Sequence, residues 1–593
     1  MAPQVYTSPV PDYPVLTTSV FTRVFSSRAP GDVGGFPGSQ KAFVDASSGA
    51  SITRAQLLHL SLSFAHGLKY HPRTSPFANR GNVVLIYSPN SLAWPVVLFG
   101  SVAAGLRCAL ANSAYTSDEL AFQYSDSRAN LILTSEEGLD VVRATFAKIG
   151  VAKEDADRRI IVLGNDLRWA GGPSAAPCSA AAGLLKMEDL LGAGKLDHEE
   201  SFEGHLAHET TYLCYSSGTT GKPKGVETTH QNMTTILDIM GAAFPPVRTG
   251  LDMMLGILPF YHIFGVSKLL HFPFVLGIPV VIQRRFDPIQ FCAVIEKYRV
   301  TMSMVVPPIL VVLARHPAVD HYDMSSLEIL FCGAAPLGHT LAKSVKTRLL
   351  AKRGGRGVFD ITQGYGLTET SPSTHMLPLA DAARKMGSIG ILLPNLQARL
   401  VEDDDGNLDA GPGQPGELWV RGKTVMKGYL NNSAATKHAI TPEGWFRTGD
   451  VAVRDAEGYY YIVDRRKELI KYKGFQVPPA ELENVLLTHP DVADAAVIGV
   501  DNVEEATELP RAYIVHVNPS VVQTAKARAD FGNSVAKWMT TKVARHKYLR
   551  GGVEIIDVVP KSASGKILRR ELRELAKRQL KQSYPTMQVE ARL

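Results

Sequence analysis

Short apolar runs alternate with helical patterns along the first third of the chain. The run Val83–Tyr87 is uniformly apolar, which is typical of a strand buried on both faces, and an apolar helical segment follows it to about Ala104. The same order returns as a strand Arg107–Ala111, a helix opened by the capping box Thr116–Glu119, and a strand Ala129–Thr134. This alternation predicts a doubly wound α/β sheet.

The pattern resumes near residue 287 and then changes twice. Asp287-Pro288 caps and opens a helix to Tyr298, and Ile329–Cys332 is a β-run. From about Gly406, short strands between glycine-rich turns predict a small β-rich subdomain. After Asp464 the predicted elements are a helix Ala480–Thr488, strands Ala495–Val500 and Ala512–Val517, a long helix near 521–542 and a last helix from about Lys566. We therefore expect a large α/β N-terminal domain, residues 1–463, and a smaller α+β C-terminal domain, residues 464–593.

Composition narrows the class of protein. The 593 residues are too many for one hydrophobic core, which agrees with several subdomains. The 63 basic and 57 acidic residues give a net charge of only +6, so we expect no nucleic-acid partner. The five cysteines are widely spaced, without a C-x-x-C pair, which favours a reducing compartment over disulfides or a structural zinc. No apolar run approaches about 18 residues, so no transmembrane segment is expected, and no secretory signal is recognisable.

The terminal triplet Ala591-Arg592-Leu593 has the small, basic, leucine character of the S-K-L targeting signal. It predicts recognition by the peroxisomal import receptor and a peroxisomal location. Without such recognition the protein is expected in the cytoplasm.

The strongest chemical signal is the segment Tyr215-Ser-Ser-Gly-Thr-Thr-Gly-Lys-Pro-Lys-Gly225. Small hydroxyl and glycine residues let backbone N–H groups surround a polyphosphate, and the lysines compensate its charge. The segment is not a Walker A loop, because Pro223 follows Lys222 where that pattern has Ser or Thr. A strand-like run, Thr211–Tyr215, leads into it, which a flexible linker would not need. We interpret the segment as a phosphate-binding loop.

Six further blocks follow in a fixed order. They are Leu258-Pro-Phe-Tyr-His262, Gly333-Ala-Ala-Pro-Leu337, Gln363-Gly-Tyr-Gly-Leu-Thr-Glu369, Thr448-Gly-Asp450, Asp464-Arg-Arg-Lys-Glu-Leu-Ile-Lys-Tyr-Lys-Gly474 and Pro560-Lys-Ser-Ala-Ser-Gly-Lys566. With the loop they span residues 216–566, and through them the chain resembles the acyl- and aryl-CoA synthetases of the adenylate-forming superfamily, most of all the 4-coumarate–CoA ligases.

The resemblance implies a reaction in two halves. A substrate carboxylate attacks the α-phosphorus of Mg-ATP and gives an acyl adenylate and pyrophosphate. The thiol of coenzyme A then attacks the acyl carbon and releases AMP. Chemistry at phosphorus of this kind depends on positioning and charge neutralisation more than on a covalent nucleophile.

The resemblance also assigns residues to the first half-reaction. Lys566 would bridge the carboxylate and the α-phosphate, Thr368 would bond the α-phosphate, and Glu369 would hold Mg²⁺ as a hard oxygen ligand. Tyr365 would offer its ring to adenine, and Asp450 would accept hydrogen bonds from the ribose. The implied ATP- or AMP-binding residues are Ser216, Ser217, Gly218, Thr219, Thr220, Lys224, Gln363, Gly364, Tyr365, Thr368, Asp450, Arg465, Lys467, Lys471 and Lys566.

For the second half-reaction the resemblance implies a rotation of the C-terminal domain about the hinge residue Asp464, which brings another face to the site. The implied CoA-binding residues are Arg285, Lys473, Gly474 and Gln476. His262 would flank the acyl site and control entry of the thiol, and it joins Lys566 and Thr368 as an implied catalytic residue.

The implied acyl pocket is mostly apolar. Its residues are Tyr261, His262, Phe264, Val305, Phe331, Gly333, Ala334, Gly364, Leu367 and Pro372. Plant 4-coumarate ligases commonly have a tyrosine at the position of Phe264 and a lysine at that of Phe331. Both differences remove polar groups, so we expect an unsubstituted aryl or a medium-chain aliphatic acid instead of a phenolic one.

Three alternatives use the same fold. A stand-alone adenylating enzyme would load the pantetheine of a carrier protein in place of CoA, and a luciferase-like oxygenase would oxidise the adenylate. A catalytically inactive scaffold is disfavoured, because Lys566, Glu369 and Asp450 are all present.

Overall fold

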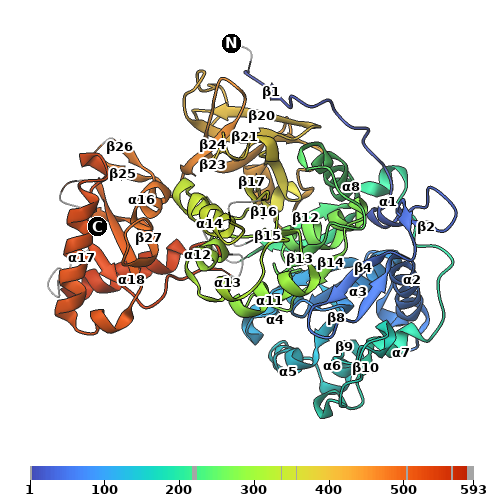
Figure 1. The fold of residues 1–593 in the computed structure, drawn as a ribbon. Helices are drawn as coiled ribbons and strands as arrows, with labels where there is room; N and C mark the ends of the chain where they lie inside the picture. Colours follow the sequence, from blue (N-terminus) through green and yellow to red (C-terminus); the bar gives the residue numbers. More distant parts are fainter. Residues whose placement is uncertain are drawn as a thin grey trace, which may run out of the picture.

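The computed structural model describes residues 3–216, 223–335, 337–354, 357–473, 475–502, 505, 507–562 and 565–583. Figure 1 shows a large N-terminal part, coloured blue to gold, and beside it a smaller C-terminal part in orange and red. The fold is α/β with a separate α+β C-terminal domain, which confirms the predicted class.

The first large sheet is built from the alternating segments at the beginning of the chain. Its strand order is β10 (Leu185–Lys186), β9 (Ile160–Leu163), β8 (Ala129–Ser135), β6 (Val83–Tyr87), β7 (Arg107–Ala111), β11 (Thr210–Ser216), β12 (Lys224–Thr229) and β22 (Gly428–Tyr429). The strands from β10 to β11 are parallel, and β12 and β22 are antiparallel additions. The predicted capping box forms at Thr116, whose side chain accepts from the N–H of Glu119 at the start of α4 (Ser117–Asp126).

The second large sheet continues the same architecture. Its order is β19 (Ile391–Leu392), β18 (Ser373–Met376), β17 (Asp360–Gly366), β16 (Ile329–Cys332), β15 (Met302–Val305), β13 (Met254–Gly256), β14 (Val280–Ile282), β4 (Lys41–Asp45) and β5 (Ser51–Thr53). The strands from β17 to β4 are parallel. Because carboxyl ends of parallel strands meet at one edge, the segments after β13, β16 and β17 come together there.

Helices connect these strands. They are α1 (Val20–Phe25), α2 (Arg54–Tyr70), α3 (Ala93–Ala103), α5 (Leu139–Lys148), α6 (Lys153–Arg159), α7 (Met187–Leu191), α8 (His230–Ile239), α9 (Ile263–Gly265), the π-helix η7 (Val266–His271), α10 (Phe272–Leu276), α11 (Pro288–Tyr298), α12 (Pro307–Arg315), α13 (Ala318–His321), α14 (His339–Ala351) and α15 (Ser433–Ala439). One large apolar cluster joins both sheets, with Trp94 and Phe260 in edge-to-face contact inside it.

The predicted β-rich subdomain is an antiparallel sheet. Its order is β1 (Tyr6–Thr7), β20 (Leu396–Val401), β21 (Gly416–Gly422), β23 (Phe446–Arg454) and β24 (Tyr460–Arg465). Asp464 and Arg465 still pair with β23, opposite Val451 and Asp450. The sheet therefore extends two residues past the expected end of the N-terminal domain at residue 463.

The C-terminal domain has its own small cores. Its elements are the hairpin β25 (Ile470–Tyr472) and β26 (Phe475–Val477), the sheet β27 (Val492–Asn502), β28 (Thr507–His516) and β29 (Val553–Ile555), and the helices α16 (Pro479–Leu486), α17 (Ala525–Met539) and α18 (Arg569–Ser583). The last helix begins at Arg569 and not near Lys566, because Lys561 and Ile567 form a β-bridge that holds the preceding segment in a turn.

Candidate active site

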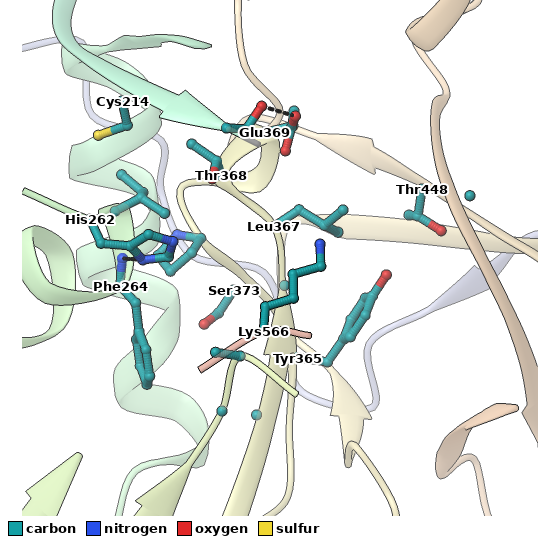
Figure 2. A pocket seen from close by; sticks show the side chains of 18 of the residues that line it. Cys214, His262, Phe264, Tyr365, Leu367, Thr368, Glu369, Ser373, Thr448 and Lys566 are labelled. Carbon is teal, nitrogen blue, oxygen red and sulfur yellow. Dashed lines mark hydrogen bonds between the residues drawn. The ribbon is translucent and has the colours of Figure 1, made fainter. Parts of the chain in front are cut away.

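A cavity of about 780 Å³ opens where β11, β16 and β17 end against the C-terminal domain. Figure 2 shows His262, Phe264, Tyr365, Leu367, Thr368, Glu369 and Lys566 around it. Most of the residues predicted from the sequence line this one space. They are Ser216, Lys224, Tyr261, His262, Phe264, Phe331, Gly333, Ala334, Gln363, Gly364, Tyr365, Leu367, Thr368, Glu369, Pro372, Arg465, Lys467 and Lys566.

Ser216 and Lys224 mark the two ends of the predicted phosphate loop. They are register partners on β11 and β12, and both side chains line the cavity. The Lys224 ammonium lies 4.7 Å from the centre of the Tyr429 ring, which holds it beside the cavity. The predicted loop residues Ser217, Gly218, Thr219 and Thr220 lie outside the described residues.

Glu369 is 7% exposed and lies in the short 3-10 turn Thr368–Thr370. Its Oε1 accepts hydrogen bonds from Ser216 Oγ at 3.0 Å and from Tyr429 OH at 2.9 Å. Both of these hydrogen bonds fall on one oxygen of a carboxylate, and carboxylate oxygens are the ligands that a hard cation such as Mg²⁺ would take here. Among the residues that the structure describes, no cluster of three or more His, Cys, Asp or Glu side chains could hold a metal by itself.

A connected set of polar groups forms the predicted nucleoside end. Tyr365 OH donates to Asp450 Oδ2 at 2.6 Å, and Arg465 Nε lies 3.1 Å from Asp450 Oδ1. Burial and the charge of Asp450 raise the pKa of Tyr365 above its usual value, so the phenol stays protonated and donating. Asp450 itself lies behind the cavity surface, which Thr448 and Gly449 line in its place.

Lys566 enters the cavity from the C-terminal domain. Burial, followed by the nearby Arg465, lowers the pKa of Lys566 to about 8, while Asp450, Glu468 and Glu369 act in the opposite direction. The ammonium form therefore still predominates at neutral pH, and additional negative charge in the cavity favours it further.

His262 caps the short helix α9, with Nδ1 accepting from the N–H of Phe264 at 3.2 Å. Burial, and after it the charge of Lys566, lowers the pKa of His262 to about 4. The imidazole is therefore neutral at physiological pH, and Nε2 carries the proton because Nδ1 is an acceptor.

Aromatic side chains form the predicted acyl end of the cavity. Phe331 stacks on Phe244 with ring centres 4.9 Å apart and planes 11° apart. A Cβ at Gly333 would lie 3.1 Å from the ring of Phe264, so the glycine leaves that ring its space. Met304 lines the cavity where Val305 was predicted, because successive side chains of β15 point to opposite faces and that of Val305 is in the core.

One charged residue in this apolar region was missed from the sequence. Lys268, on the π-helix η7, lines the cavity and is only 6% exposed. Lys268 therefore adds one buried charge to a lining that was expected to be mostly apolar. The available signal was a single lysine inside the apolar run Ile263-Phe-Gly-Val-Ser-Lys-Leu-Leu.

The described members of the predicted CoA-binding set do not line the cavity. Arg285 is exposed after β14, and Gln476 is exposed on β26. Lys473 is exposed and pairs with Glu505 at 3.2 Å, and Gly474 lies outside the described residues. Lys471, predicted to bind nucleotide, is also exposed on β25, away from the cavity. In this arrangement the Lys566 side of the C-terminal domain faces the cavity, and the roles of these five residues stay predictions.

The predicted hinge residue Asp464 joins the two domains. Its Oδ2 accepts from the N–H of Ala480 at 3.0 Å, and its Oδ1 accepts from the N–H of Arg465 at 2.6 Å. Burial raises the pKa of Asp464 to about 6. The carboxylate therefore ties the last strand of the N-terminal domain to α16 of the C-terminal domain.

The chain is similar in sequence to known protein families and to known ligases. The model of the AMP-binding enzyme family matches residues 32–430, and that of the AMP-binding enzyme C-terminal domain matches residues 481–566. The chain is 35% identical over 501 residues to the probable 4-coumarate–CoA ligase 3 of Dictyostelium discoideum, covering 84% of this chain and 86% of that protein. It is 32% identical over 571 residues to the peroxisomal OPC-8:0-CoA ligase 1 of Arabidopsis thaliana, covering 96% and 95%.

A solved structure shows the same fold. The anthranilate CoA ligase AuaEII in complex with anthranoyl-AMP has a TM-score of 0.79 at 23% identity, covering 96% of this chain and 99% of that one. The chain belongs to the AMP-binding enzyme family, the adenylate-forming acyl-CoA synthetases. Within that family it is 4-coumarate–CoA ligase-like, an acid–thiol ligase of the AMP-forming type, which confirms the resemblance seen in the sequence motifs.

The helices of the described residues are too short or too polar for a bilayer. None of them combines the length and the apolar character needed to cross a membrane.

Proposed function

We propose that this ligase activates an acid with a largely apolar acyl body and that Lys566, Thr368 and Glu369 carry the adenylation step. The chemistry itself is ATP-dependent acyl-CoA ligation through an acyl adenylate. The observation that supports the residue roles is the position of Lys566, which reaches from the C-terminal domain into the cavity that Thr368 and Glu369 line.

Lys566 would hold the attacking carboxylate beside the α-phosphate. Both groups are anionic, and their repulsion opposes the attack on phosphorus. An ammonium between them offsets the repulsion, and its partial burial strengthens the effect because little water screens it. Thr368 would add a hydroxyl donor to an α-phosphate oxygen.

Glu369 would hold Mg²⁺ against the phosphates, and the ion would neutralise their charge. Ser216 and Tyr429 orient the carboxylate through their hydrogen bonds to its Oε1. Ser216, Lys224 and the loop between them would hold the β- and γ-phosphates. Gln363, Gly364 and Tyr365 would line adenine, with Asp450, Arg465 and Lys467 nearest the ribose.

Thioester formation would use another face of the C-terminal domain. In the present arrangement Lys473 and Gln476 are exposed away from the cavity, whereas Arg285 is exposed on the N-terminal domain and would not move with the rotation. Rotation about Asp464 would withdraw Lys566 and bring the β25–β26 hairpin to the site. The neutral His262, on the cavity wall, would control access of the thiol.

The acyl group would lie between Phe264, Phe331 and Phe244. Rings at the first two positions cannot hydrogen-bond a phenol, so cinnamate should have a higher kcat/KM than 4-hydroxycinnamate. The difference should exceed the roughly tenfold effect of one methylene. A kinetic panel in which 4-hydroxycinnamate is the best substrate would refute this preference.

The deciding experiment measures AMP release with ATP and Mg²⁺ over a panel of aryl and aliphatic acids, with and without CoA. Acid-dependent AMP release that needs CoA and gives a thioester supports the proposal. Adenylate formation without a CoA thioester favours transfer to a carrier protein, and oxygen uptake favours the luciferase-like alternative. No acid-dependent nucleotide chemistry with any acid would overturn the proposed roles.

We further propose a peroxisomal location, read from Ala591, Arg592 and Leu593, which lie outside the described residues. One relative bears the name peroxisomal OPC-8:0-CoA ligase 1, which supports this proposal. An N-terminal fluorescent fusion should form puncta that coincide with a peroxisomal marker, and removing the three residues should disperse them. Diffuse fluorescence from the intact fusion would contradict the proposal.

A further inference from the structure

Lys268 stands out among the lysines of the active-site cavity. It lies in the middle of η7, a π-helical turn between α9 and α10, and π-helical turns occur often at functional sites. All six residues of η7 are buried, and Lys268 is the one that lines the cavity. A charged group is therefore present at the apolar end of the cavity.

The surroundings of Lys268 offer its ammonium no strong acceptor. Nζ contacts the thioether sulfur of Met240, and it lies 5.7 Å from the centre of the Phe272 ring. A thioether accepts hydrogen bonds weakly, and an aromatic ring at that distance gives a modest attraction. No carboxylate among the described residues forms an ion pair with Lys268.

Burying the Lys268 ammonium without an acceptor costs free energy, unless a bound ligand supplies the acceptor. Burial lowers the pKa of Lys268 to about 7 from its usual value near 10.5. A methionine or leucine would fill the same volume without that cost, and buried charges in proteins are normally paired. A lysine in such a place, on the wall of a binding cavity, is a candidate for contact with a ligand.

The two ends of the cavity have different chemistry. Lys566 lies among Arg465, Asp450, Glu468 and Glu369, the charges that surround the phosphates in the proposed function. The contacts of the Lys268 ammonium with described residues are the Met240 sulfur and the Phe272 ring, and burial lowers its pKa. Phe272, the ring beside Lys268, is in edge contact with Phe244, which stacks on Phe331. A ligand whose reacting carboxylate lies near Lys566 would therefore meet Lys268 with the other part of its acyl group.

We propose that Lys268 is a specificity-determining residue that binds a second carboxylate at the far end of the acyl group, so that dicarboxylic acids with an apolar middle are preferred substrates. This inference rests on the proposed function, because it takes the Lys566 end as the site of activation. The anion would replace the missing acceptor and hold Lys268 in its charged form. The aromatic walls formed by Phe264, Phe331 and Phe244 would contact the methylene chain between the two carboxylates.

The test compares matched acids on matched variants. Hexanoate, octanoate and decanoate are each paired with the dicarboxylic acid of the same length, and the monomethyl ester of octanedioate keeps the length without the charge. Lys268→Met removes the ammonium at similar volume. Ser267→Ala is the control, because it changes a buried polar side chain of the same turn that lacks a hydrogen-bond partner among the described residues.

For the wild type, one dicarboxylic acid should exceed its monocarboxylic partner and the methyl ester in kcat/KM. Lys268→Met should lower kcat/KM for that acid by about 100-fold or more, since a buried polar group discriminates strongly against a ligand that lacks its partner. The same variant should keep or raise the value for the monocarboxylic acid, and Ser267→Ala should keep the wild-type ratio. An equal ratio of the two kcat/KM values in wild type and Lys268→Met would overturn the inference.

Binding without turnover separates this inference from the proposed function. Calorimetric titration of hexanedioate, octanedioate and decanedioate into wild type and Lys268→Met, without ATP, reports the second carboxylate directly. Binding of one of them that is lost in Lys268→Met supports the inference even if no acid releases AMP, which would be a failure of the proposed function alone. Equal binding to both proteins, or to neither, would refute the role of Lys268 while leaving the adenylation roles intact.

Discussion

Lys268 and Arg569 are both buried cations, but their surroundings differ. Arg569, at the start of α18, donates through Nε to Glu468 at 2.8 Å and through Nη2 to Glu483 at 3.0 Å, and its Nη1 also contacts Glu483 and donates to the carbonyl of Val497 at 3.1 Å. Among the described residues, the Lys268 ammonium contacts a thioether and lies near a ring. The pKa of Arg569 is raised by its carboxylates, while that of Lys268 is lowered by burial.

The difference indicates what each charge contributes. Arg569 joins the segment after the hinge to α16 and to β27, so it holds the C-terminal domain together around the turn that presents Lys566. Its partners belong to the protein itself. Lys268 has no such partners among the described residues, and it lines the cavity. A buried charge with internal partners is structural, whereas one without them is available to a ligand.

The largest expected effect comes from making the same substitution at both cations. Arg569→Met leaves Glu468 and Glu483 buried without their partner, so the free energy of unfolding should fall by about 3–5 kcal/mol. Lys268→Met removes an unpaired charge, so the same quantity should stay constant or rise by about 1–4 kcal/mol. Calorimetric unfolding measures both, with Arg570→Met as an exposed control on α18. Changes of the same sign and size would remove the distinction between the two sites.

Lys566 sharpens the comparison, because it is a cavity lysine that does have carboxylates nearby. Lys566→Ala should reduce acid-dependent pyrophosphate release by about 10² to 10³, the usual effect of losing one positioned charge, while a supplied acyl adenylate should still react with CoA. Lys577→Ala, on the exposed side of α18, is the control.

Gly474→Leu should produce the opposite pattern, because the proposed CoA arm needs close approach to the backbone there. Separate assays of the two half-reactions check this pair of variants. Loss of the same half-reaction in both, with folding intact, would exclude alternation about Asp464.

The stability of wild type relative to Lys268→Met should depend on pH. Below pH 7 Lys268 is charged in the folded and unfolded states, so the full cost of burying the charge lowers wild-type stability. Between pH 7 and about 10.5 the folded protein has lost this proton and the unfolded chain has kept it, so wild-type stability rises with pH relative to the variant. The advantage of Lys268→Met should therefore shrink by about 2–3 kcal/mol between pH 6 and pH 9. A pH-independent difference in unfolding free energy would show that Lys268 is not the titrating group.

The smallest effect concerns substrate choice. The ratio of kcat/KM for octanedioate to that for octanoate should fall about twentyfold from pH 6.5 to 8.5, as Lys268 in the free enzyme loses its proton. Titration of Lys566 affects both acids and cancels in the ratio. Of the other groups on this wall, His262 has its pKa lowered to about 4, and burial raises the pKa values of Tyr261, Cys214 and Cys332, so none of them titrates in this range. A ratio that does not change with pH would show that substrate choice does not depend on the charge of Lys268.

The sequence by itself determined the features that contiguous residues specify. The capping box at Thr116, the strand Arg107–Ala111 and the helix opened by Asp287-Pro288 all form where the local pattern predicts them. The ordered motifs also identified the family, and most of the residues that they singled out line the cavity, because each motif keeps backbone and side chains within one short loop or strand end.

Tertiary structure decided the features that depend on what packs around a residue. The choice of Met304 over Val305 follows from the face that β15 turns to the cavity, and the late start of α18 follows from a bridge between Lys561 and Ile567. The composition does not distinguish Lys268 from the other lysines of the chain. Its burial beside Met240, without a carboxylate, exists only after η7 packs against the segment that follows α8, and that packing gives the charge its lowered pKa and its place in the cavity.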